Sequence, residues 1–229
     1  MELYKSKADL YDKFISQSGK SYEKVADVIE KYLGKNDFIL ELAAGTGNYA
    51  LEFKKRGYKN YVCSDINDEL LKIAKKKTNF KCIHLDMKSF SLKEKFDAVL
   101  ILFKSINYNL NINELRNTLQ NSFNSLNKNG KIVIEITNPD IILKNPKSGA
   151  FLFDINKDYF LIHLTDVENR FLTHYFIFLD KKTHKCEIDK HKNYIFKTEE
   201  ITDLMKNLGF GKIEKQLLGN TLLIIGYKQ

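Results

Sequence analysis

The sequence predicts an α/β protein built around a mostly parallel sheet, and two observations support this prediction. Between residues 22 and 137, short apolar runs alternate with segments in which apolar residues recur at helical spacing. Alternation at these lengths is typical of strand–helix–strand units with right-handed crossovers. In addition, the almost unbroken apolar run FDAVLILF at 96–103 suits the centre of a sheet that is covered on both faces.

The expected elements follow from local signals along the chain. A helix over 22–33 begins after Ser21, a good N-cap residue, and ends at Gly34. The strands expected next are 38–43, 60–65, 80–86, 96–103 and 131–137. The helices expected between them are 47–56, 68–77 and 114–127, the last of these stopping at Asn129-Gly130.

The pattern changes after Asn138-Pro139. Short β-type stretches separated by turns fill 150–196, which predicts antiparallel hairpins inserted into the sheet domain. A helix capped by Thr198, with Glu199 and Glu200 in its first turn, and two strands, 212–218 and 221–227, complete the chain. The two-residue Gly219-Asn220 connection suits a hairpin, so the last of seven strands is expected to run antiparallel.

Composition predicts one globular domain without a membrane or secretory segment. The chain has 229 residues, 43% of them hydrophobic, and its first residues lack the basic and apolar regions of a secretory signal. No apolar stretch approaches the roughly 20 residues that span a bilayer. Three widely spaced cysteines without a C-x-x-C pair indicate neither a zinc site nor a disulfide framework. We therefore expect a cytoplasmic protein.

A net charge of +8 raises the possibility of a nucleic-acid partner. However, the basic runs at 54–56 and 75–77 fall where helices are expected to end, and cations there complement the helix dipole. A solvated basic surface is favoured over a nucleic-acid surface.

The segment FILELAAGTG at 38–47 indicates a nucleotide-type site. Gly45-x-Gly47-x-x-Ala50, with Asp65 lying 20 positions after Gly45, fits the dinucleotide fingerprint, and taken alone it would support an NAD enzyme. Glu41 favours a different ligand, because a carboxylate at this position would repel a pyrophosphate. S-adenosylmethionine (SAM) presents an ammonium and a sulfonium instead.

With LELAAGTG at 40–47, Asp65, LDM at 85–87, FDAVLILF and the closing helix and hairpin, the sequence resembles the class I SAM-dependent methyltransferases. The resemblance implies their Rossmann-like fold, a SAM cofactor and S-adenosyl-L-homocysteine as product. It implies that Asp65 binds the ribose, Asp86 the adenine amino group, and that Met87 packs on adenine. The full implied cofactor set is Tyr11, Glu41, Ala43, Gly45, Gly47, Asp65, Ile66, Asp86, Met87 and Leu102.

Motifs of nucleic-acid methyltransferases are missing from the sequence. LFKSINYN follows the fourth strand where base-amino enzymes carry [DN]-P-P-[YF], and no Pro-Cys nucleophile is present. Three segments, 8–22, 102–108 and 150–196, instead resemble N-methyltransferases acting on nucleotide-linked amino deoxysugars, and more loosely glycine N-methyltransferase-like enzymes. EITNP at 135–139 departs from their pattern and leaves the class of sugar open.

This second resemblance implies a small-molecule amine as acceptor, with 140–196 as a substrate lid. It implies a single domain, 1–229, with an N-terminal helical cap over 1–34 and a SAM-binding core formed by 35–139 and 197–229. Tyr11 is predicted to be catalytic by orienting the sulfonium and the acceptor. The predicted substrate residues are Phe14, Lys20, Ser105, Tyr108, Glu135 and His174.

Methyl transfer is expected to occur by in-line displacement, with positioning supplying most of the acceleration. No metal is predicted, and the protein is expected to be a monomer or homodimer without nucleic-acid or membrane partners. His163 and His191, like His174, are candidate proton acceptors.

Structural alternatives remain open for several of these residues. Glu41, Asp86 and Glu135 would then cap loops or turns, Met87 and Tyr11 would pack in a core, and the histidines would lie on strand faces. Two alternative functions also remain open: an RNA or protein methyltransferase, and an NAD-type oxidoreductase.

Overall fold

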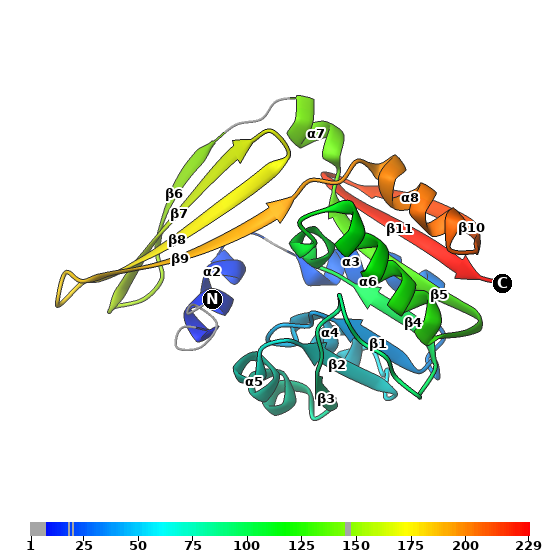
Figure 1. Cartoon of the computed structure of the whole chain (residues 1–229). Helices are drawn as coiled ribbons and strands as arrows, with labels where there is room; N and C mark the ends of the chain where they lie inside the picture. The colour runs from blue at the N-terminus through cyan, green and yellow to red at the C-terminus, as the bar shows by residue number, and fades with distance from the viewer. Residues whose placement is uncertain (1–7, 18, 20, 145–147) are drawn as a thin grey trace.

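The protein consists of a seven-stranded sheet with helices on both faces and a separate four-stranded sheet (Figure 1). The computed structural model describes residues 8–17, 19, 21–144 and 148–229. The large sheet has the strand order β10-β11-β5-β4-β1-β2-β3. Its strands are β1 Ile39–Leu42, β2 Tyr61–Asp65, β3 Lys81–His84, β4 Phe96–Ile101, β5 Leu126–Thr137, β10 Phe210–Leu218 and β11 Thr221–Lys228.

The direction of the strands confirms the predicted fold class. Strands β1 to β5 pair in parallel with their sheet neighbours, whereas β11 pairs antiparallel with both β5 and β10. Seven strands of which only the last runs backwards are what the sequence predicted.

Helices cover both faces of this sheet, as the unbroken apolar run of β4 requires. One face packs against α6 Ile112–Ser125 and α8 Thr198–Asn207, and the other against α3 Tyr22–Ile29 and α4 Asn48–Lys55. The remaining helical segments are α2 Ala8–Gln17, η1 Glu30–Tyr32, α5 Asp68–Thr78, η2 Ser105–Tyr108 and α7 Pro139–Lys144. No helix among the described residues is long and apolar enough to cross a bilayer.

The start of β5 corrects one predicted boundary. Helix α6 ends at Ser125, and β5 begins at Leu126, opposite Phe96 of β4, so Asn129-Gly130 lies inside the strand. Asn129 adopts a positive φ of 63°, and a Cβ on Gly130 would lie 2.9 Å from the Asn127 carbonyl oxygen. The pair therefore produces a local irregularity within the strand, where the sequence suggested a helix stop.

The inserted segment forms a single antiparallel sheet, which we call the lid. Its strands are β6 Gly149–Asp154, β7 Tyr159–Glu168, β8 Phe171–Asp180 and β9 Cys186–Tyr194, paired in that order. Helix α2 lies against one face of the lid (Figure 1), where Phe14 joins Leu161, Phe176 and Phe178 in a buried apolar cluster. We call this the inner face.

A polar contact also ties the lid to the core. Arg170, between β7 and β8, donates from Nη1 to Glu200 Oε1 of α8 over 2.8 Å and from Nε to the Ile195 carbonyl oxygen over 2.9 Å. The guanidinium lowers the pKa of Glu200, as expected for a carboxylate held by a cation.

Candidate active site

A cavity of about 830 Å³ opens where the carboxyl ends of β1, β2 and β4 meet α2 and the inner face of the lid. In open α/β sheets this edge is the usual place for ligands. The core, helix α2 and the lid all contribute residues to its wall. Those from the core include Glu41, Ala43, Gly45, Thr46, Asn48, Asp65, Ile66, Asp86, Met87, Leu102, Ser105 and Tyr108; those from α2 and the lid include Tyr11, Phe14, Phe153, His163, His174, Phe176 and His191.

The turn between β1 and α4 brings backbone N–H groups to the cavity. The Gly45 N–H donates to Asp65 Oδ2 over 2.8 Å, and the Asn67 N–H donates to Asp65 Oδ1 over 2.9 Å. Asp65 is buried, and burial raises the pKa of its carboxyl group. The acid predicted to bind ribose therefore lies on the cavity wall, held in place by two backbone donors.

Gly47 has a different position from Gly45. Its φ is +76°, and a Cβ on it would lie 2.8 Å from the Cβ of Ala74 on α5. Gly47 is not among the described residues that line the cavity. It allows α4 and α5 to approach each other closely, whereas Gly45, with open space around it, contributes to the cavity wall.

Glu41 lies deeper in the cavity and is almost fully buried. Its Oε2 accepts a hydrogen bond from the Tyr61 hydroxyl over 2.8 Å. Burial raises the pKa of Glu41 to about 8, and the nearby carboxylates of Asp65 and Glu135 act in the same direction. At neutral pH the side chain is therefore mainly protonated, and a cation bound beside it would favour the ionised form.

Asp86 and Met87, the residues predicted to contact adenine, both line the cavity, as do Ile66 and Leu102 of the predicted cofactor set. Met87 is 7% exposed and Leu102 is 2% exposed, whereas Ile66 is half uncovered. Asp86 Oδ1 accepts the Lys88 N–H over 2.9 Å, which makes this acid a turn cap as well as a wall residue. An apolar surface flanked by a carboxylate suits a purine ring with an exocyclic amine.

Helix α2 is attached to the glycine turn by Asp12, a residue that the sequence analysis missed. Asp12 Oδ1 accepts the Thr46 hydroxyl over 2.6 Å and the Asn48 amide over 3.1 Å, and Oδ2 accepts from Lys77 of α5. Together these contacts attach α2 to the glycine turn. Helix α2 carries Tyr11 and Phe14, which both line the cavity. No local pattern marks Asp12, because its partners are 34 or more positions away.

Two histidines of the lid form a hydrogen-bonded pair on the cavity wall. His163 Nε2 and His174 Nδ1 lie 3.0 Å apart, and the two rings are stacked. Burial lowers the pKa of His163, and it lowers the pKa of His174 to about 3. Both are therefore neutral at physiological pH.

His191 makes a separate set of contacts. It is 3% exposed and lies on β9, with its Nδ1 2.9 Å from the Tyr108 hydroxyl and its Nε2 3.2 Å from Asp189 Oδ2. Burial lowers its pKa despite the carboxylate beside it. The inner face of the lid thus presents aromatic rings and uncharged imidazoles to the cavity.

Glu135 is not among the described residues that line the cavity. It is completely buried, and its Oε2 accepts both the Tyr49 hydroxyl and the Phe103 N–H, each over 2.7 Å. Phe103 and Lys104 adopt positive φ angles of 53° and 64°. Glu135 therefore holds the turn that carries Lys104 and Ser105 into the cavity.

One predicted substrate residue, Lys20, lies outside the described residues. The described residues contain no group of three or more His, Cys, Asp or Glu side chains arranged to hold a metal ion.

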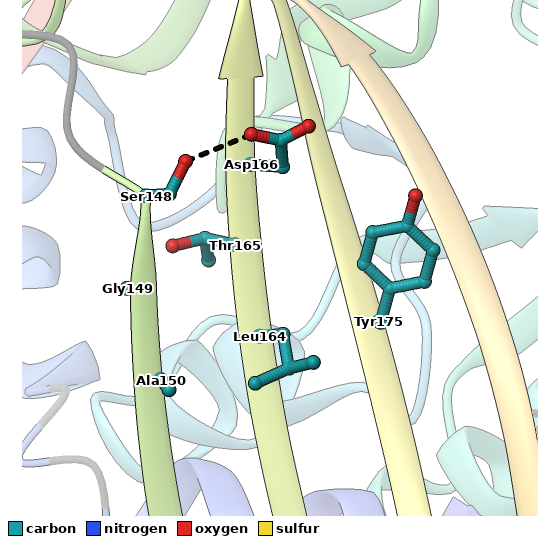
Figure 2. A pocket seen from close by; sticks show the side chains of 7 residues that line it. All are labelled: Ser148, Gly149, Ala150, Leu164, Thr165, Asp166 and Tyr175. Carbon is teal, nitrogen blue, oxygen red and sulfur yellow. Dashed lines mark hydrogen bonds between the residues drawn. The ribbon is translucent and has the colours of Figure 1, made fainter.

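A second, shallow groove lies on the lid between Ser148, Thr165 and Tyr175 (Figure 2). It shares no lining residue with the cavity, and in it the Ser148 hydroxyl donates a hydrogen bond to Asp166 Oδ1 over 2.8 Å. It is not a candidate active site.

Comparison with known proteins shows similarity to methyltransferases. Residues 39–130 match a family described as a methyltransferase domain. A dTDP-3-amino-3,4,6-trideoxy-alpha-D-glucopyranose N,N-dimethyltransferase of Streptomyces venezuelae is 29% identical over 133 residues, which cover 56% of this chain and 56% of that enzyme. The aligned part thus spans little more than half of the length of that relative.

Two solved structures show that the similarity in fold extends over nearly the whole chain. A SAM-dependent methyltransferase from Clostridium acetobutylicum superposes with a TM-score of 0.80 at 21% identity, covering 98% of both chains. DesVI of Streptomyces venezuelae superposes with a TM-score of 0.81 at 21% identity, covering 97% of this chain and 98% of the other. Residues 39–130 match the methyltransferase-domain family, and these likenesses confirm the predicted fold: the chain has the fold of the SAM-dependent methyltransferases.

Proposed function

We propose that the protein transfers a methyl group from SAM to the amine of a small molecule, most specifically a nucleotide-linked amino deoxysugar. The observation that carries this proposal is the shared cavity, which is lined both by the glycine turn with Asp65 and by the aromatic inner face of the lid. A donor bound along the sheet edge and an acceptor bound under the lid would meet in one enclosed space.

The donor side of the cavity fits SAM by its chemistry. Asp65 and Asp86 offer carboxylate oxygens to hydroxyl and amine donors, and Met87 offers an apolar surface for a purine. Glu41 is the residue that separates SAM from a dinucleotide. Its pKa of about 8 means that a cationic ligand is stabilised by ionising it, whereas a pyrophosphate gains nothing from a buried carboxyl group.

The acceptor side fits an amine that reacts in its neutral form. The inner face of the lid carries Phe153 and Phe176, with Phe14 of α2 beside them, together with imidazoles whose pKa values burial has lowered. Such surroundings disfavour an ammonium ion and so favour the free amine, whose lone pair attacks the methyl carbon. Holding the two reactants in line can supply up to roughly 7–11 kcal/mol of barrier reduction.

The identity of the acceptor is supported by the relative from Streptomyces venezuelae, whose name specifies a dTDP-linked amino sugar. A diphosphate would need cationic partners, and Lys88 and Lys104 are the lysines among the described residues of the cavity wall. Lys88 also contacts Glu114 over 2.6 Å. We further propose that the protein works in the cytoplasm, in keeping with its three free cysteines, as a monomer or homodimer.

Titration calorimetry with SAM, S-adenosylhomocysteine and NAD, followed by mass spectrometry of products from a panel of amino-sugar nucleotides, tests the proposal. We expect micromolar binding of both sulfur compounds, no competition by NAD and a mass increase of one or two methyl groups on one member of the panel. Binding of NAD in place of SAM would support an oxidoreductase. Methylation of RNA or protein but not of any amine would retain the cofactor and reject the acceptor.

A further inference from the structure

We propose that Tyr108, His191 and Asp189 form a proton relay that removes the proton released by the acceptor amine. This inference rests on the proposed function and names the groups that complete its chemistry. The three side chains form a continuous chain of hydrogen bonds, with 2.9 Å between the Tyr108 hydroxyl and His191 Nδ1 and 3.2 Å between His191 Nε2 and Asp189 Oδ2.

The direction of the relay follows from its far end. A carboxylate can only accept a hydrogen bond, so Nε2 of the neutral His191 carries the hydrogen and donates it to Asp189. Nδ1 is then the acceptor and takes the hydrogen bond from the Tyr108 hydroxyl. Asp189 thereby fixes the tautomer in which His191 is ready to receive a proton.

The relay connects the two halves of the cavity. Tyr108 ends η2, the short helix that follows β4 of the core, whereas His191 and Asp189 lie on β9 of the lid. Tyr108 and His191 both line the cavity that contains Asp65 and Leu102. His191 is 3% exposed, so a proton reaches it through Tyr108 more readily than from bulk water.

The surroundings of His191 keep its imidazole neutral. His174 is its partner across the β8–β9 pair, and His163 lies beside His174 on β7. The ring of Phe176 packs edge-on at 5.1 Å, and Lys104 is close enough to His174 to lower the pKa of that residue. Asp189 is the carboxylate in contact with His191, and it opposes the effect of burial on the pKa of the imidazole.

The proton balance of the reaction is simple. The amine lone pair forms the new N–C bond while the bond between sulfur and the methyl carbon breaks and its electrons return to sulfur. The methylated nitrogen then loses a proton to the Tyr108 oxygen as the Tyr108 hydroxyl proton moves to His191 Nδ1. The resulting imidazolium is stabilised by Asp189 and returns its proton to water when the product leaves.

The roles of the three residues differ in this scheme. Tyr108 is the catalytic residue, because its hydroxyl contacts the acceptor nitrogen. His191 and Asp189 act through Tyr108 and are positioning residues. A second methylation of the same nitrogen depends on the relay, because a protonated secondary amine has no free lone pair.

Steady-state and single-turnover kinetics of Tyr108→Phe, His191→Asn and Asp189→Asn test the relay between about pH 5 and pH 9. Matched controls are Tyr175→Phe, on the opposite face of the lid, and His184→Asn, in the exposed β8–β9 turn at a positive φ that asparagine tolerates. We expect kcat of the first two variants to fall by about 10²-fold, the usual size of a general-base effect. SAM affinity should stay within about twofold, since the relay does not contact the donor.

The pH profile separates a relay from a merely structural role. Wild-type kcat, which reports the groups of the enzyme–substrate complex, should fall in acid, at a pH below the ordinary titration of histidine, because burial lowers the pKa of His191. His191→Asn should lose this acid limb, and Asp189→Asn should move it further into acid. The relay would be overturned if Tyr108→Phe and His191→Asn both kept the kcat and the pH profile of the wild type. It would also be overturned if the substitutions changed only KM.

Two controls keep these outcomes interpretable. If His191→Asn fails to fold, Tyr108→Phe alone decides, since removal of one hydroxyl leaves the ring contacts in place. A wild-type protein that binds SAM but methylates no amine would overturn the proposed function, and the relay with it. Turnover by the wild type with unaffected variants would overturn the relay alone.

Discussion

The backbone N–H of Phe103 donates a hydrogen bond to Glu135 Oε2 over 2.7 Å, and the same oxygen accepts the Tyr49 hydroxyl. Phe103 and Lys104 both have positive φ angles, a conformation that costs a non-glycine residue of order 1–3 kcal/mol. A fully buried carboxylate therefore stabilises the strained turn that carries Ser105 into the cavity.

Replacement of Glu135 by Gln should lower both stability and turnover. The amide keeps one acceptor oxygen but loses the charge, and hydrogen bonds to charged groups contribute about 1.5–3 kcal/mol. We expect the free energy of unfolding to fall by about that amount, and kcat to fall more than the affinity for SAM changes. Urea denaturation and calorimetry measure these quantities, with the exposed Glu94→Gln as control. Unchanged stability would contradict the inference that the Glu135 carboxylate stabilises this turn.

Glu41→Gln should remove a pH dependence from folding. The pKa of Glu41 is raised from 4.5 to about 8, so the folded state holds a proton that the unfolded state releases near pH 4.5. Its contribution to stability is therefore complete below about pH 4.5 and is lost as pH rises through about 8, at about 1.4 kcal/mol per pKa unit before allowance for relaxation. Denaturation of the wild type between pH 5 and pH 9 should show this decline, and the glutamine variant should lack it.

The same substitution should affect cofactor binding in the opposite sense. A cation beside Glu41 favours the ionised carboxylate, so binding of SAM should release protons and strengthen as pH rises through about 8. Calorimetry in buffers of different ionisation enthalpy detects that release. Equal proton release by wild type and Glu41→Gln would exclude Glu41 as its source.

The two glycines of the turn should respond differently to alanine. At Gly47 the new Cβ would lie 2.8 Å from the Ala74 Cβ at a φ of +76°, so we expect a loss of stability well above the roughly 1 kcal/mol of a positive φ alone. At Gly45 nothing lies within 4 Å, and only the smaller cost applies. Thermal denaturation measures the loss of stability in each variant. A larger loss in Gly45→Ala than in Gly47→Ala would contradict the described position of the turn. Gly45→Ala should chiefly weaken SAM binding, because Gly45 lines the cavity.

Asp12→Ala should release helix α2 from the glycine turn. The substitution removes acceptors for Thr46, Asn48 and Lys77 in a partly buried position. We expect SAM affinity to fall about tenfold, equivalent to about 1.4 kcal/mol, since Tyr11 and Phe14 would no longer be held over the site. Asp27→Ala, which alters an exposed contact to Arg56, is the control. Equal affinity in the two variants would show that α2 is not needed to retain the cofactor.

Much of the core could be predicted from sequence because its signals are local. The apolar runs of β1, β4 and β5, and the cap provided by Asn67, each specify an element within a few residues. The beginning of β5 at Leu126 could not be predicted in this way, because it depends on pairing with Phe96, 30 positions earlier. Local propensity at Asn129-Gly130 favoured a helix end that this pairing overrides.

The candidate site likewise has some residues that local sequence signals predict and others whose roles depend on contacts between distant segments. The turn at Gly45 and the acid Asp65 follow from motif and spacing, and both lie on the cavity wall. The roles of Asp12 and Glu135 arise from contacts between elements far apart in the chain. The sequence identified Glu135 as chemically interesting, but only the packing of β5 against the turn after β4 shows that its carboxylate accepts the Tyr49 hydroxyl and the Phe103 N–H.

The lid is one uninterrupted stretch of chain, β6 to β9, between a strand and a helix of the core. Its exchange for a foreign sheet would leave the order of the seven core strands intact. If the proposed function holds, a change of the accepted amine therefore needs substitutions in one contiguous block of the gene, while the residues that bind the donor stay unchanged. In this architecture the lid can be replaced as one segment, without changes to the core sheet.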